Sequence, residues 1–106
     1  MPPRTWYTFA DVRIPMRPVP IRYVDEFRSL FQEIQRIEKD EGTLLAERVR
    51  ATYEMYLFGV LQLLHYYEVP LGVDQIENSA SIDDMQTFIE KQMELQTQEA
   101  KLVHEI

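Results

Sequence analysis

Apolar residues recur at spacings of three and four through the middle of the chain, beginning after residue 23. Charged side chains occupy the intervening positions as far as residue 39, which predicts an amphipathic helix over about 24–40. Gly42 and its polar neighbours then interrupt the pattern, and a glycine inside a helix costs about 1 kcal/mol relative to alanine. We therefore expect a break at 40–43, with Thr43 capping a second helix. The alternative is one continuous rod over 24–68, which would be about 68 Å long.

The predicted second helix, about 43–68, is apolar on nearly every face. It has no acidic or basic side chain between Met55 and Tyr67 apart from His65, and Pro70 and Gly72 follow its end. A helix of this kind has to be covered nearly all round. The side chains expected to form its main apolar stripe are Leu45, Val49, Tyr53, Tyr56, Val60, Leu63 and Tyr67.

A third helix is predicted over 82–105. Ser81 and Asp84 have the spacing of a capping box, in which each side chain accepts a hydrogen bond from the other residue's backbone N–H. Apolar residues then recur at intervals of seven, as in a coiled coil, although glutamines at 92 and 96 interrupt the stripe. Helices two and three are similar in length, as an antiparallel pair would be. The sequence thus predicts an all-α domain over 24–106, built as an antiparallel helical hairpin or a three-helix arrangement.

The first 23 residues, called the arm below, have a different composition. They contain all but one of the six prolines and show no helical period. Residues 5–14 are rich in β-branched and aromatic side chains, which predicts a short strand with Trp6, Thr8, Ala10, Val12 and Ile14 on one side. Pro15, Pro18 and Pro20 favour a stiff, extended continuation. We expect an extended arm joined to a helical domain.

Charge is distributed unevenly between these two parts. The whole chain has a net charge of −7, from 18 acidic and 11 basic residues. The arm has four arginines against Asp11 alone, a charge of +3, so the remaining residues sum to −10. The acidic excess argues against direct contact with nucleic acid, because phosphate binding needs a basic face. The basic arm has an electrostatic reason to dock on an acidic body, either its own or that of another copy, and the sequence leaves both open.

Residues suited to catalysis or metal binding are scarce. The absence of cysteine excludes disulfides and cysteine-based zinc sites, and the scattered glycines form no phosphate-binding loop. His65 has only Glu68 as a nearby ligand, and His104 lies at the end of the chain. We expect no metal, no cofactor and no enzymatic activity. No apolar run is long enough for a membrane span, and the N-terminus lacks a secretory signal. The expected location is intracellular, in the cytoplasm or within a virion or another assembly.

One segment points to an enzymatic alternative. Residues 44–48, Leu-Leu-Ala-Glu-Arg, resemble the first-helix motif of the small all-helical chorismate mutases. The resemblance implies a helical enzyme that holds a dicarboxylate substrate with several cations. After Arg50, however, this chain has no lysine or arginine before Lys91. A mutase-type enzyme is therefore kept as the remote alternative.

The concentration of aromatic residues suggests a role in protein–protein contact, because tyrosine and tryptophan are enriched where proteins meet. The expected function is that of a non-enzymatic structural or adaptor subunit that self-associates, as a homo-oligomer, or docks into a larger assembly. Within the arm, Trp6 is the expected anchor and Arg13 or Arg17 the expected partner of carboxylates. The candidate contact residues are Trp6, Tyr7, Phe9, Arg13, Arg17, Tyr53, Tyr56, Tyr66 and Tyr67.

A second interpretation starts from the acidic residues of the third helix. A small acidic regulator or inhibitor could offer this face to a basic protein surface, as mimics of nucleic acid do. Binding of that kind would weaken steeply with ionic strength, whereas an apolar interface would not. The residues of this face are Asp83, Asp84, Glu90, Glu94, Glu99 and Glu105.

Overall fold

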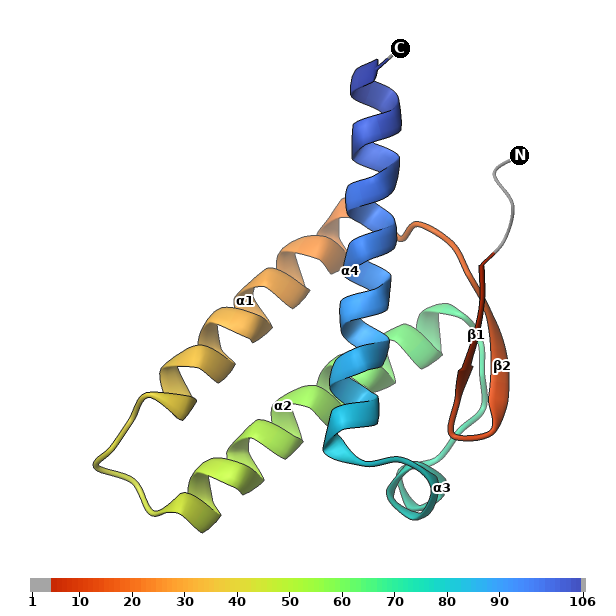
Figure 1. Ribbon diagram of the computed structural model, residues 1–106. Coiled ribbons are helices and arrows are strands. Elements are labelled where there is room, and N and C mark those ends of the chain that lie inside the picture. Colours follow the sequence, from red (N-terminus) through yellow and green to blue (C-terminus); the bar gives the residue numbers. More distant parts are fainter. Residues whose placement is uncertain (1–4, 106) are drawn as a thin grey trace.

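The structure, a computed structural model, describes residues 5–105, with side chains described for residues 6–97 (Figure 1). Within this range the chain forms two strands and four helices. In chain order these are β1 (Thr5–Phe9), β2 (Val12–Met16), α1 (Ile21–Glu38), α2 (Leu45–Tyr66), α3 (Val73–Ser79) and α4 (Ile82–Glu105). The mostly helical character is confirmed. The chain as a whole is not strictly all-α, because the arm, in which one short strand is predicted, forms an antiparallel β-hairpin.

The β-hairpin divides the segment that the sequence predicts as one strand. Phe9 pairs with Val12 across a two-residue turn, and Ala10 and Asp11 both have positive φ, 49° and 65°. Such turns suit the right-handed twist of paired strands. The turn also changes which residues share a side. Tyr7, Phe9, Val12, Ile14 and Met16 face inward, and Trp6, Thr8, Arg13 and Pro15 form the opposite face.

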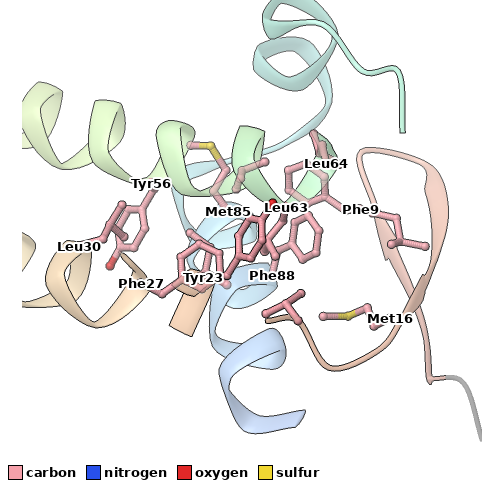
Figure 2. Close-up of a cluster of buried hydrophobic side chains, with 14 of the residues drawn as sticks. Phe9, Met16, Tyr23, Phe27, Leu30, Tyr56, Leu63, Leu64, Met85 and Phe88 are labelled. Carbon is pink, nitrogen blue, oxygen red and sulfur yellow. The ribbon is translucent and has the colours of Figure 1, made fainter. Parts of the chain in front are cut away.

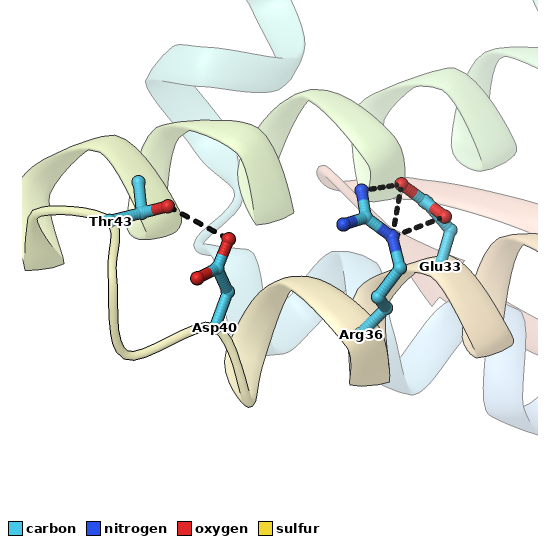
Figure 3. Close-up of polar contacts among 4 residues, drawn as sticks. All are labelled: Glu33, Arg36, Asp40 and Thr43. Carbon is cyan, nitrogen blue, oxygen red and sulfur yellow. Dashed lines mark hydrogen bonds and ion pairs between the residues drawn. The ribbon is translucent and has the colours of Figure 1, made fainter.

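The first two helices are separated by a loop, as the break at Gly42 predicts, and no continuous rod is present. The predicted cap is wrong: Leu44 precedes the first turn of α2 and makes no side-chain capping bond. The Thr43 hydroxyl instead donates to Asp40 Oδ2 at 2.9 Å (Figure 3), and the Gly42 N–H donates to Asp40 Oδ1 at 3.1 Å. Asp40 therefore fixes the loop that reverses the chain.

The predicted capping box at the start of α4 is confirmed. The Ser81 N–H donates to Asp84 Oδ2 at 2.9 Å, and the Asp84 N–H donates to Ser81 Oγ at 3.1 Å. From this cap α4 crosses the α1–α2 pair and packs on both helices (Figure 1). The crossing is close at Gly59, where the Cβ of any larger residue would lie 2.8 Å from Ile89 Cδ1. Gly59 therefore allows α2 and α4 to approach.

The hydrophobic core draws on every element, including the arm (Figure 2). Its aromatic centre includes Phe27 of α1, Tyr56 of α2 and Phe88 of α4, and α3 adds Ile76. Phe9, Ile14, Met16 and Val19 of the arm are also buried against the helices of the same chain. The arm thus packs in cis. None of the described helices is both long and apolar enough to cross a membrane.

Candidate interaction surfaces

Two glutamines of α4 hold the proline-rich end of the arm. The Gln96 side chain bonds both backbone groups of Val19, accepting from its N–H at 2.7 Å and donating to its carbonyl at 3.1 Å. Gln92, which is fully buried, donates to the Arg17 carbonyl at 3.0 Å. The Tyr67 hydroxyl contacts the same residue, accepting from Arg17 N–H at 3.1 Å. The backbone N–H and C=O groups of this extended segment have no hydrogen-bond partner in a helix or a sheet. The side chains of Gln92, Gln96 and Tyr67 supply those partners instead.

The arginines next to this contact lie against aromatic rings of the same chain. The Arg17 guanidinium is 5.1 Å from the Tyr66 ring centroid and 5.7 Å from that of Tyr67. Arg22 is 5.0 Å from the ring of Tyr23. Burial raises the pKa of the Tyr67 phenol above its usual range, and the hydroxyl donates to the Arg17 carbonyl at 2.9 Å. The predicted residues Arg17, Tyr66 and Tyr67 are thus brought together, and they fasten the arm to α2.

The other tyrosines and Phe9 also make contacts within the chain. Tyr56 and Phe9 belong to the core, and Tyr7 is half-buried, with its ring stacked 5.4 Å from that of Phe88. The Tyr53 hydroxyl donates to the carboxylate of Glu77 on α3, and this hydrogen bond raises the pKa of the phenol. These four aromatic side chains therefore support the fold.

Trp6 and Arg13 are both exposed and contact each other, whereas the exposed Arg17 contacts Tyr66 and Tyr67. Trp6 is 53% exposed, and the Arg13 guanidinium lies 4.7 Å from its ring centroid, within the range of a cation–π contact. Thr8 and Pro15 lie on the same face of the strands. We call this face, Trp6, Thr8, Arg13 and Pro15, the hairpin surface. It combines an indole with a positive charge.

A second exposed surface lies where the α1–α2 pair ends at its connecting loop. Leu44 and Leu45 are 71% and 68% exposed, and Val49 is 49% exposed. We call these three residues the tip surface. Leu45 and Val49 belong to the main stripe of α2, which the sequence predicts to be covered, and the arm does not cover them in this chain. The stripe continues beyond the point where α4 crosses, so Leu45 is left mostly exposed and Val49 about half exposed (Figure 1).

Beside the tip surface is a hollow of about 240 Å³. Arg48 reaches along it to donate to the Glu38 carbonyl at 3.3 Å, and Arg48 Nε is buried without a hydrogen-bond partner in the described structure. Arg48 is the basic residue in the lining, and Glu38 is the acidic one. The residues that line the hollow are Glu38, Leu45, Arg48, Val49, Thr52 and Ile82.

The third surface is a groove between α1 and α2, with a volume of about 610 Å³. Phe58, which is 54% exposed, and Met55 supply its apolar part from α2. The α1 side carries three carboxylates. Glu33 is paired with Arg36, which lowers the pKa of the Glu33 carboxyl (Figure 3). The other two, Asp25 and Glu26, are exposed and have no ion-pair partner among the described residues. The full lining is Asp25, Glu26, Ser29, Leu30, Glu33, Met55 and Phe58.

The acidic face of α4 is only partly within the described side chains. Asp83 and Glu90 are exposed, Glu94 pairs with Lys91 at 3.6 Å, and Asp84 is used in the capping box. Glu99, Glu105 and His104 lie outside the residues whose side chains the structure describes. His65 is exposed, and the described residues contain no group of three side chains that could hold a metal ion.

Comparison with known proteins adds no relative: neither a protein-family model, a curated protein nor a solved structure matches this chain. The three surfaces are therefore the basis for a functional argument. The signal for the groove was present in the sequence, where Phe58 falls outside the main stripe of α2. The sequence did not show that this side of α2 would lie beside the carboxylates of α1.

Proposed function

We propose that this protein is a non-enzymatic structural subunit that associates with other copies of itself, within a virion or another larger assembly. The observation that carries the proposal is the tip surface. Three large aliphatic side chains stand together in solvent at one end of the fold. Clustered apolar exposure of this kind is typical of surfaces that are covered in an assembly.

The energetics favour a cover over the tip surface. Leu45 and Val49 lie on the same stripe of α2 as the core residues Tyr56 and Leu63. Burying a leucine or valine side chain fully contributes about 1.5 to 3 kcal/mol relative to leaving it exposed. A neighbouring subunit placed over the first two turns of α2 would gain a large part of this free energy.

The test is the mass of the protein in solution, measured by sedimentation over a wide range of concentration. The wild type should rise above the mass of one chain as concentration increases. Leu45→Gln/Val49→Gln should weaken the association at least about tenfold, since each tenfold change corresponds to about 1.4 kcal/mol. The matched control is Ile21→Gln, which removes an isoleucine that is 72% exposed at the start of α1, away from the tip. A wild-type protein that keeps the mass of one chain at the highest concentrations would contradict the proposal.

The acidic-regulator interpretation remains the second candidate, because Asp83 and Glu90 present exposed carboxylates along α4. The two candidates differ in their response to salt. Binding of a basic protein through these carboxylates should weaken steeply between low and physiological ionic strength. Association through the tip surface should change little over the same range.

A further inference from the structure

We propose that the hairpin surface of one copy docks into the α1–α2 groove of a second copy. The proposal rests on the self-association proposed above and names a second contact for it. It joins two surfaces of opposite character: an exposed indole with a guanidinium, and an apolar hollow bordered by unpaired carboxylates.

The chemistry of the two surfaces is complementary. Trp6 would place its ring against Phe58 and Met55, which are the apolar part of the groove lining. Arg13 would then lie near Asp25 and Glu26, the two carboxylates without an ion-pair partner in the described structure. Aromatic and arginine side chains dominate the binding energy of many interfaces.

Of the arm cations with described side chains, Arg13 is the one available for this contact. Arg17 is held by Tyr66 and Tyr67, and the Arg22 guanidinium lies on the ring of Tyr23. Arg13 lies over the ring of Trp6, which, unlike the rings under Arg17 and Arg22, is exposed and belongs to the hairpin surface itself. Arg13 and Trp6 can therefore dock together without breaking contacts of the core.

The two surfaces do not meet within one copy. Tyr7 and Phe9, on the inner face of the same strands, pack on Phe88 and so hold the β-hairpin against α4. The groove is lined by α1 and α2 alone. Figure 1 draws the β-hairpin at the opposite edge of the fold from α1, beside the C-terminal end of α2. Contact between the surfaces thus requires a second copy.

A contact between two different surfaces has a consequence for assembly. Each copy keeps one free hairpin surface or one free groove after a dimer has formed, so growth continues into rings or open chains. An interface that used the same patch on both copies would stop at the dimer. The mass of the assembly in solution therefore distinguishes the two kinds of interface.

Trp6 is the one tryptophan in the sequence, so tryptophan fluorescence reports on the proposed contact directly. The experiment uses the full chain with Leu45→Gln/Val49→Gln, which removes two of the three apolar side chains of the tip surface. Its emission should shift to the blue as concentration rises, because docking takes the indole out of water. Asp25→Lys/Glu26→Lys should weaken this association at least about tenfold, since like charges would face each other. Asp74→Lys/Glu90→Lys makes the same change of charge elsewhere and should leave the shift intact.

Mixing two variants in the same tip-substituted background gives the decisive result. One variant, Trp6→Ala/Arg13→Ala, has an intact groove and no tryptophan; the other, Asp25→Lys/Glu26→Lys, has Trp6 and a reversed groove. Each alone should have the mass of one chain, while the mixture should form a 1:1 complex with blue-shifted emission and grow no further. Circular dichroism confirms that each variant is folded.

Two results would overturn the inference. One is a mixture of folded variants that shows neither a complex nor a shift; the other is a tip-substituted protein that stays a single chain while the wild type associates. The second result would leave the proposed self-association standing. If the wild type itself never associates, the proposed function and this contact fail together.

Discussion

Removal of residues 1–20 should unfold this protein, because the arm is part of its core. Four side chains of the deleted segment, Phe9, Ile14, Met16 and Val19, are at most 6% exposed. At about 1.5 to 3 kcal/mol for each buried side chain, their loss amounts to roughly 6 to 12 kcal/mol, an upper estimate. The hydrogen bonds from Gln92 and Gln96 to the arm are lost as well. Small domains are stable by about 5 to 15 kcal/mol in total.

The assay is far-ultraviolet circular dichroism with urea unfolding of the truncated and full-length chains. The truncated chain should lose most of its helical signal and show no cooperative transition. Ile14→Ala, a milder change at a fully buried residue, should cost about 2 to 5 kcal/mol. Trp6→Ala/Arg13→Ala is the control, since both side chains are exposed, and it should leave the transition nearly unchanged. A truncated chain that stays helical and melts like the full-length protein would refute the assignment of the arm to the core.

Three further predictions concern single positions, each measured by urea unfolding. Leu63→Ala should cost about 2 to 5 kcal/mol because Leu63 is fully buried, and a loss below about 1 kcal/mol would contradict its place in the core. Asp11→Val should cost about 1 to 2 kcal/mol because φ is 65° there, whereas Asp11→Gly should cost less; equal losses would argue against this turn. In the wild-type background, a Cβ at residue 59 would lie 2.8 Å from Ile89 Cδ1, so Gly59→Ala should not stabilise the protein. In an Ile89→Val background that atom is absent, and Gly59→Ala should stabilise α2 by about 1 kcal/mol. The same effect in both backgrounds would show that the helices do not meet there.

The helices follow from local signals that the sequence contains. The three- and four-residue spacing of apolar positions identifies α1, and the capping box between Ser81 and Asp84 gives the start of α4 to the residue. The β-hairpin lacks such a signal. Two-residue turns with positive φ favour asparagine and glycine, and this one contains Ala10 and Asp11. Tertiary packing of Phe9 and Ile14 sustains a turn that its own residues do not specify.

For a related reason, the sequence could not predict how much of the apolar side of α2 is buried by other elements. Periodicity shows which side of α2 is apolar, but the length of that side that is covered depends on where α4 crosses it. Leu45 and Tyr56 belong to the same stripe, yet only Tyr56 is buried. The glutamines of α4 were misleading in the same way. In sequence they interrupt a coiled-coil pattern, whereas in the structure Gln96 bonds both backbone groups of Val19.

The arm serves the fold and the proposed contact through alternate residues. Phe9 and Ile14 face the helices, and Trp6 and Arg13 face solvent, because successive side chains of a strand point to opposite sides. Deletion of the arm removes both sets at once, so loss of association in a truncated chain would report only that the chain has unfolded. Substitution of Trp6 and Arg13 removes the outer set and leaves the inner one. A role for the arm in assembly is therefore tested by these two side chains, in a protein that still folds.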